Sequence, residues 1–402
     1  MKLQGKKQVN ALVILMTVTY MVSYITRINY GAIISEMEKS TGIARSLLSM
    51  ALTGSFITYG IGQIVSGILG DKFSPKKLVS TGFIITIIMN LFIPICKSPY
   101  QMLAVWCVNG FAHSLMWPPI VKLSTSLLSD EDYSRATTKI SWGSSMGIIF
   151  VYLTSPLLIS LFGWKSVFVF SAVLGIIMLV IWNEYSYDIE IEPRNKTKGK
   201  HGSSLKVLFT PIMLCIMLAI ILQGMLRDGV TTWMPSYISE TYSLSNVISI
   251  LTGVILPIFS ILSTYIALKL YTKKMTNPVM CAAVIFGVGA ISSLGLCFVT
   301  GHSAVLSVVL SALLTGCMHG VNLMLICMVP AFFKKYGNVS TVSGVINSCT
   351  YIGSAMSAYG IAFISEKHGW NFTLKIWLFI AIAGTLICMA SVKGWKREHQ
   401  SN

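Results

Sequence analysis

The chain has 402 residues, of which 54% are hydrophobic and only 11% are charged, and its mean hydropathy is +0.72. Soluble globular domains carry roughly a quarter charged residues, so this composition excludes that class and indicates a polytopic membrane protein. The formal net charge of +16 could suggest a nucleic-acid partner. The basic residues alternate from loop to loop, however, which is the pattern of membrane topology.

Apolar stretches of about 20 residues, the length of a helix that crosses a bilayer, recur along the whole chain. They lie at residues 11–35, 47–70, 77–96, 100–128, 137–161, 165–184, 207–238, 245–270, 277–299, 303–333, 340–365 and 371–392. We therefore predict an all-α membrane protein with twelve transmembrane helices, numbered below as spans 1 to 12 in this order.

The basic residues predict the orientation of these spans. If the N-terminus is cytoplasmic, 21 of the 30 Lys and Arg residues fall in tails and loops on that side, and six fall on the opposite side. Cytoplasmic loops of membrane proteins carry such an excess. We expect a multi-pass protein of the cell inner (plasma) membrane with both termini in the cytoplasm, a monomer whose macromolecular surroundings are the lipid bilayer and not nucleic acid.

An internal repeat relates the two halves of the chain. At an offset of 206 residues, Gly110 corresponds to Gly316, Gly147 to Gly353, and the pair Gly163-Trp164 to Gly369-Trp370. His113 corresponds to His319 in the same register. Such a repeat predicts two similar six-helix bundles, with the substrate site between them near the midplane of the membrane. We expect one bundle at 1–184, a cytoplasmic linker at 185–205 and a second bundle at 206–402.

Two arginines, Arg27 in span 1 and Arg227 in span 7, lie inside apolar stretches. A charged side chain within a membrane span is costly and usually marks a functional site. Arginine stays protonated in proteins, and its planar fork suits a carboxylate or a phosphate. Two such forks facing one cavity would bind a small anion. The alternative is that each arginine is a structural charge bonded to backbone carbonyls or to neighbouring helices.

Three further residues near the arginines are candidates for anion binding. Tyr20 and Tyr24 share one helix face with Arg27, so their hydroxyls can lie beside the same anion. Asp228 is the one carboxylate well inside a span. It can orient Arg227, take up a coupling proton, or point to a neighbouring helix, and we favour the orienting role.

The loop after span 2 reads GILGDKFSPKK, with Gly67, Asp71, Lys72 and Pro75 at its characteristic positions. It resembles the signature loop of the major facilitator superfamily. The corresponding loop of the second half, LKLYTKKMTNP, keeps a basic pair but has no aspartate. Together with twelve spans, the repeat and a central linker, this resemblance implies the two-bundle fold of that superfamily.

Spans 1, 4 and 7 carry further motifs. These are Tyr24-x-x-Arg27-x-Asn29, the elements Asn109-Gly110 and Trp117-Pro118-Pro119, and Leu226-Arg227 followed by Trp233-x-Pro235-x-Tyr237. The motifs resemble those of the organophosphate:phosphate antiporter family, whose members exchange glycerol phosphate or hexose phosphates for inorganic phosphate. Span 11, SGVINSCTYIGSAM, is also similar to a glycine-spaced helix of that family. The resemblance implies that the arginines of spans 1 and 7 bind the substrate phosphate. From the span 1 motif we take Asn29 as a further candidate for substrate binding.

The chain departs from that family at two cationic positions. Gln63 in span 2 and Met146 in span 5 stand where the glycerol-phosphate branch has a lysine and a histidine. His113, which replaces a family glutamine, can donate to a substrate phosphate and carry part of the missing charge near neutral pH. It can equally be a hydrogen-bonded histidine packed between helices. The same two readings apply to His319, its repeat mate.

We therefore expect a secondary transporter of a small organic anion, with a phosphate ester exchanged for inorganic phosphate. Two alternatives stay open: a proton- or sodium-coupled symporter of organic anions such as hexuronates, and a sugar-phosphate receptor that does not transport. An enzyme is not expected, since the chain has no nucleophile elbow and no phosphate-binding glycine loop. Nine cysteines without a CxxC pair indicate no metal site and no cofactor.

Overall fold

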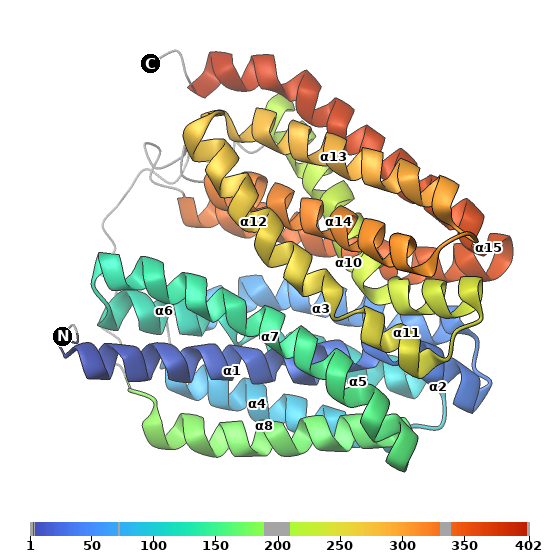
Figure 1. Ribbon diagram of the computed structural model, residues 1–402. Helices are drawn as coiled ribbons and strands as arrows, with labels where there is room; N and C mark the ends of the chain where they lie inside the picture. The colour runs from blue at the N-terminus through green and yellow to red at the C-terminus, as the bar shows by residue number, and fades with distance from the viewer. Residues whose placement is uncertain (1–2, 4, 71–72, 189–209, 330–338, 400–402) are drawn as a thin grey trace. The chain divides into compact units, whose positions relative to one another are not determined.

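The structure is a computed structural model of the chain, and it describes residues 3, 5–70, 73–188, 210–329 and 339–399 (Figure 1). Over these residues the regular elements are helices, and no strand occurs among them. Ten of the helices in this part of the chain are long and apolar enough to cross a membrane. The all-α membrane fold predicted from the sequence is thereby confirmed.

The ten apolar helices cover eleven of the twelve predicted spans, because α15 (Val339–His399) contains spans 11 and 12 on either side of a kink at Gly369. Span 4 is divided into two shorter helices, α5 (Pro99–Ser114) and α6 (Trp117–Leu127). The prediction of one continuous helix over 100–128 is therefore wrong. Pro118 and Pro119 explain this break, since proline fits the first turn of a helix but disrupts its interior. Span 8, predicted at 245–270, is also divided, into helices at Asn246–Thr252 and Ile255–Lys273.

The chain folds into two compact units. Unit 1 comprises Met1–Arg194 and Asn246–Val254, and unit 2 comprises Asn195–Ser245 and Ile255–Asn402. Unit 1 thus includes a short helix, α11 (Asn246–Thr252), that follows span 7 in the sequence. This helix packs on α7 (Asp130–Phe162), where the Tyr152 ring lies against Gly253.

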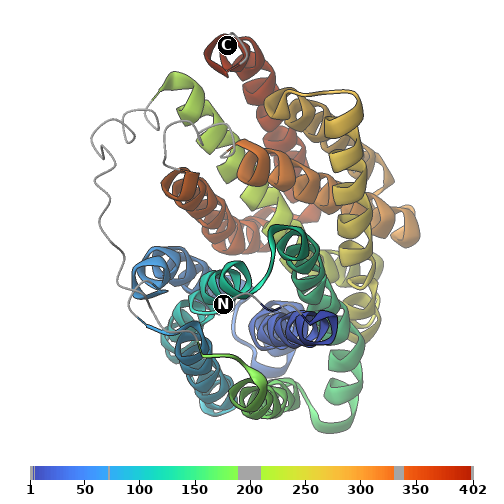
Figure 2. The same ribbon diagram turned by 90° about the vertical axis from the view of Figure 1, so that its left-hand side faces the viewer.

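In unit 1, α1 packs against α7, α3 against α5, and α4 against α8. These helices run side by side in Figure 1, and the view turned by 90° shows several of them nearly end-on (Figure 2). Besides α5, α6 and α11, the helices of this unit are α1 (Lys6–Ala32), α2 (Ile34–Thr41), α3 (Arg45–Gly70), α4 (Pro75–Phe92), η1 (Ile93–Ile95), α7 (Asp130–Phe162) and α8 (Lys165–Tyr185).

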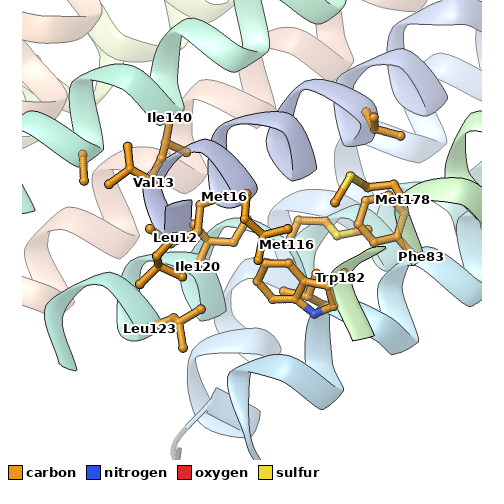
Figure 3. Packing of buried hydrophobic residues seen from close by; sticks show 14 of the residues in the cluster. Leu12, Val13, Met16, Phe83, Met116, Ile120, Leu123, Ile140, Met178 and Trp182 are labelled. Atoms are coloured by element: carbon orange, nitrogen blue, oxygen red, sulfur yellow. The ribbon is translucent and has the colours of Figure 1, made fainter. Parts of the chain in front are cut away.

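The hydrophobic core of unit 1 joins α1 to four other helices of this unit (Figure 3). Met16 of α1, Phe83 of α4 and Trp182 of α8 are fully buried there. Met116, at the break between α5 and α6, packs against the same cluster. The indole Nε1 of Trp182 donates to the carbonyl oxygen of Lys76 at 3.1 Å, so its one polar atom is satisfied. This packing fixes the helix that carries Arg27.

Unit 2 is built around α10, which packs against α15 and α14, while α12 packs against α14 and α13 against α15. The π-helical turn η2 extends α14. Pi-helical turns occur frequently at functional sites. The elements of this unit are α10 (Pro211–Tyr242), α12 (Ile255–Lys273), α13 (Pro278–Val299), α14 (Ala304–Asn322), η2 (Leu323–Met328) and α15.

The glycines of the internal repeat mark matching helix crossings in the two units. Gly110 of α5 lies against the backbone of Ser55 on α3, and Gly316 of α14 lies against the backbone of Phe259 on α12. A Cβ at either glycine would collide with a main-chain oxygen of the partner helix. Small residues allow helix backbones to approach this closely in membranes.

A second pair of crossings repeats in the same way. Gly147 of α7 lies against the carbonyl oxygen of Met21 on α1, and Gly353 of α15 lies against the carbonyl oxygen of Ile221 on α10. Span 5 therefore crosses span 1 in unit 1 as span 11 crosses span 7 in unit 2. This correspondence matters for function, because α1 and α10 carry the two membrane arginines.

The repeated Gly-Trp pair marks the helix ends that follow these crossings. Gly163 has φ 77 and ψ 170 at the end of α7, and Gly369 has φ 75 and ψ 175 at the kink of α15. This backbone region is essentially restricted to glycine. Each glycine therefore lets one span end and the next begin within a few residues.

Candidate functional site

Arg27 lies in the last part of α1 and is half-buried among aromatic rings. Its guanidinium carbon lies 4.2 Å from the ring centroid of Tyr59 and 6.0 Å from that of Phe56, both on α3. The ring of Tyr24, one turn earlier on α1, is 5.6 Å away. Cation–π attraction orients a guanidinium over such ring faces. Because the rings carry no formal charge, these contacts hold the cation without neutralising it.

An aromatic cluster continues from Arg27 along α1. The ring centroids of Tyr20 and Tyr24 are 5.1 Å apart, and that of Tyr20 lies 4.9 Å from the centroid of Trp117. Trp117 begins α6, directly after the break in span 4. The sequence placed Tyr20, Tyr24 and Arg27 on one helix face, and the ring contacts agree with that placement. The break brings the Trp-Pro-Pro motif to the same face.

The turn of α1 that precedes Arg27 is held by two asparagines from other helices. Nδ2 of Asn90 on α4 donates to the carbonyl oxygen of Thr26 at 3.0 Å, and Nδ2 of Asn109 on α5 donates to the same oxygen at 3.3 Å. Thr26, Asn90 and Asn109 are fully buried. Buried polar groups with all their partners make a rigid network. The backbone that carries Arg27 is therefore fixed from two sides.

Asn29 takes part in the same network, two residues after Arg27. Its Nδ2 donates to Oδ1 of Asn90 at 2.7 Å and to Oγ of Ser171 on α8 at 3.0 Å, and its Oδ1 accepts from the backbone N–H of Tyr30 at 2.9 Å. The side chain is fully buried. Asn29 thus joins α1 to α4 and α8, and its amide is engaged within unit 1.

His113, near the end of α5, reaches the network through Thr86. Its Nε2 lies 3.1 Å from Oγ1 of Thr86, and this hydroxyl donates to Oδ1 of Asn109. A threonine hydroxyl has one hydrogen, so Nε2 of His113 is the donor in the first contact. The imidazole is 3% exposed. The structure therefore places His113 among hydrogen-bonding side chains between helices.

Arg227 lies in the middle of α10 and forms a two-pronged ion pair with the next residue, Asp228. Nε and Nη2 donate to the two carboxylate oxygens at 2.8 Å each. The side chains are 14% and 19% exposed. Bidentate pairing of this kind is among the strongest charged hydrogen bonds in proteins. Neighbouring residues leave a helix about 100° apart, so the long arginine stem has to fold toward the aspartate.

Residues from two other helices complete this cluster in unit 2. Nη1 of Arg227 donates to Oδ1 of Asn322 on α14 at 3.1 Å, and Oγ of Ser354 on α15 donates to Oδ2 of Asp228 at 2.5 Å. His319 lies three residues before Asn322, on the same face of α14. It is half-buried and interacts electrostatically with Arg227 and Asp228.

The two arginines hold corresponding places relative to the repeated glycine crossings, although they lie 200 residues apart and the glycines 206. Arg27 follows Met21, the residue crossed by Gly147, by six residues, and Arg227 follows Ile221, the residue crossed by Gly353, by six residues. Their surroundings differ, with aromatic rings around Arg27 and a carboxylate, an amide and a histidine around Arg227.

Gln63 and Met146, the two positions at which the chain departs from the antiporter family, have different surroundings. Gln63 lies on α3, one turn after Tyr59, and its Nε2 is buried with no hydrogen-bond partner in the described part of the chain. Met146 on α7 is 52% exposed. A buried amide donor one turn from the ring that holds Arg27 can serve an anion there. Met146 adds no polar group.

The signature loop is described only in part. Asp71 and Lys72 lie outside the described residues. Gly67 belongs to α3, and Pro75 begins α4, where Oγ of Ser74 caps the helix by accepting from the backbone N–H of Lys77. Over the described residues, no group of three His, Cys, Asp or Glu side chains is placed to hold a metal ion.

Four polar residues of these clusters were not identified from the sequence: Thr86, Asn90, Ser171 and Ser354. Asn90 offered a signal, because an asparagine inside an apolar span is costly unless it is hydrogen-bonded. The other three carry small hydroxyls, which bond to a helix backbone as readily as to another helix. Their contacts become apparent only in the folded structure.

Comparison with known proteins finds a matching family and several similar proteins. Residues 16–358 match the model of a family described as Major Facilitator Superfamily. A probable hexose phosphate transport protein of Chlamydia trachomatis is 22% identical over 95% of this chain and 90% of the relative. The membrane sensor protein UhpC of Salmonella typhimurium is 20% identical over 88% of this chain and 84% of the relative.

Among solved structures, a bacterial homolog of the human lysosomal transporter Spinster, inward-facing and unoccupied, superposes with a TM-score of 0.75. It shares 13% sequence identity, and the match covers 99% of this chain and 98% of that one. At this identity the likeness shows the fold alone.

Proposed function

Because the chain belongs to the major facilitator superfamily, we propose that it is a secondary transporter that exchanges a small phosphate ester for inorganic phosphate. A glycerol phosphate or a hexose phosphate is the proposed substrate. Relatives at 20–22% identity include a probable hexose phosphate transport protein, and that similarity supports this substrate class. Transport proceeds by alternating access, in which the six-helix bundles at 1–184 and 206–402 rock about the bound anion.

One observation carries the proposal: Arg27 and Arg227 each follow, by six residues, the residue that a repeated glycine crosses. In this proposal one anion is bound by both guanidiniums. A planar fork offers paired donors that match phosphate oxygens. The hydroxyls of Tyr20 and Tyr24 donate to the anion beside Arg27, and His319 contributes beside Arg227.

Three of the candidate residues position the arginines in this proposal and do not contact the anion themselves. Asn29 and His113 belong to the buried network around Thr26 and position the turn that carries Arg27. Asp228 orients the guanidinium of Arg227. The residues of the signature loop, Gly67, Asp71, Lys72 and Pro75, serve the movement of helices at the cytoplasmic surface. We propose a monomer in the plasma membrane with both termini in the cytoplasm.

Counterflow in proteoliposomes tests this function. Vesicles loaded with inorganic phosphate and vesicles without it are offered labelled glycerol phosphate, hexose phosphates and hexuronates. Uptake of one phosphate ester that depends on internal phosphate is expected. Phosphate-independent uptake of a hexuronate that rises with an imposed proton gradient would reject exchange.

A coupled symporter of organic anions is the second candidate. The observation that favours it is the Asp228 carboxylate on Arg227, since symport with a proton needs an acid that titrates. A receptor is the third candidate, favoured by the likeness to a membrane sensor protein. Binding of the ester without transport in the same vesicles identifies the receptor.

A further inference from the structure

Asp228 competes with any anion that binds Arg227 through the same edge of the guanidinium. It occupies Nε and Nη2, one of the two edges that offer parallel donors. A phosphate that binds bidentately through this edge competes directly with the carboxylate. The other such edge is formed by Nη1 and Nη2, and there Nη1 donates to the amide oxygen of Asn322.

The charges of the pair also oppose the binding of an anion to Arg227. Arg227 and Asp228 together carry no net charge, so the pair attracts an anion only weakly. An anion that displaces the carboxylate would leave a second negative charge beside it, inside an apolar helix. Two like charges in such surroundings repel strongly. Protonation of the displaced carboxylate removes this repulsion.

We propose that Asp228 is an internal competitor of the substrate for Arg227, and that it takes up one proton from water when the anion displaces it. The proton binds to a carboxylate oxygen and is released when the anion leaves. This inference rests on the proposed function, because it assigns a coupling role to a residue at the same arginine. It predicts that anion binding and proton binding are linked.

The groups around Asp228 fit this role. Besides Arg227 on its own helix, α14 contributes the titratable side chain of His319 and the amide of Asn322. From α15, the hydroxyl of Ser354 donates to Oδ2, and a hydroxyl can also accept from a protonated carboxyl. The turn η2, of sequence LMLICM, carries no charged side chain.

Isothermal titration calorimetry of the full-length protein with inorganic phosphate and with glucose 6-phosphate tests the proposal. Titrations in two buffers of different ionisation enthalpy give the number of protons taken up per anion. The comparison is between the unaltered protein and Asp228→Asn, which keeps the side-chain shape. The ligand's own titration is common to both proteins and cancels in the difference.

The unaltered protein is expected to take up about one proton more per anion than Asp228→Asn. Its affinity should also fall more steeply with rising pH, by up to about tenfold per pH unit, as linkage of one proton requires. Asp132→Asn, a matched change at an acid near the start of α7, should leave the proton number unchanged.

Each other outcome overturns the inference. Equal proton numbers with retained binding overturn the coupling role alone, and loss of binding in Asp228→Asn assigns the aspartate a purely orienting role. Loss of the extra proton in His319→Gln assigns it to the histidine. If the unaltered protein binds neither ligand, the proposed function fails and this inference with it.

Infrared difference spectra of the unaltered protein give an answer that does not depend on a folded variant. Phosphate binding should produce the carbonyl band of a newly protonated carboxyl group. A spectrum without this band would contradict the proposal.

Discussion

At the residue scale, the two membrane arginines are held by different chemistry. Arg27 lies over the ring of Tyr59, whereas Arg227 is paired with Asp228 and Asn322. Both arrangements depend on the planar guanidinium, because an ammonium group cannot stack flat on a ring or donate two parallel hydrogen bonds.

Replacing either arginine by lysine is therefore expected to reduce phosphate exchange by about tenfold or more, since a lost bidentate charged contact costs roughly 1.5–3 kcal/mol. Initial exchange rates in proteoliposomes, at equal protein content, measure the effect of Arg27→Lys and of Arg227→Lys. Arg397→Lys, at an exposed position near the end of α15, is the control. Exchange at the unaltered rate by both variants would show that neither arginine binds the substrate.

The buried network around Thr26 makes a second prediction at this scale. Asn90→Ala removes donors to the carbonyl oxygens of Thr26 and Thr86 and the acceptor of Asn29. Unsatisfied buried groups cost about 1–3 kcal/mol, so the apparent Tm should fall. The KM for the ester should also rise more than kcat falls, because the turn that carries Arg27 loosens.

Asn183→Ala is the matched control, since Asn183 is exposed on α8. Its Tm and KM should stay close to those of the unaltered protein. An Asn90→Ala protein with a lower Tm but an unaltered KM would show that the network stabilises the fold without positioning Arg27.

At the element scale, hydrophobic length predicted the helices well, whereas their breaks depended on local chemistry. Span 4 was predicted as one helix because most of its residues are apolar, but the Pro118-Pro119 pair starts a new helix. The repeat glycines at 110, 147, 316 and 353 were visible in the sequence. Their partners were not, because a close backbone contact leaves no trace in the partner's side chain.

The crossing at Gly353 gives a prediction for this scale. Gly353→Ala places a Cβ against the carbonyl oxygen of Ile221, and overpacking of this kind costs about 1–3 kcal/mol. The Tm of the purified protein should fall, and exchange should fall with it, since α10 carries Arg227. Gly360→Ala on the same helix meets nothing within 4 Å, so its Tm should be unchanged or higher. Equal Tm values for the two variants would contradict the close crossing.

At the scale of the whole molecule, composition and the repeat predicted an all-α membrane fold, and the signature loop after span 2 added the resemblance to the major facilitator superfamily. The candidate site was predicted in outline, because charged residues in apolar spans are rare enough to be noticed. The sequence did not reveal which partners these residues have. The carboxylate beside Arg227 could serve three roles in the sequence, and the structure shows it bound to the guanidinium.

Topology is the first prediction at this scale. The basic residues place the linker at 185–205 in the cytoplasm. A cysteine introduced by Lys198→Cys, which lies outside the described residues, should resist an impermeant thiol reagent added to intact cells and react in inverted vesicles. A background depleted of the nine native cysteines excludes their labelling. Modification from outside intact cells would show that the linker lies on the opposite side of the membrane.

The central claim is that one site carries a phosphate ester in one direction and inorganic phosphate in the other. The most direct measurement is efflux of labelled phosphate from loaded proteoliposomes on addition of external ester, with ester uptake followed in the same vesicles. The account predicts that both fluxes start together, and that Arg27→Lys and Arg227→Lys lower both in parallel. Ester uptake without phosphate efflux, or efflux that either lysine variant leaves unchanged, would contradict it.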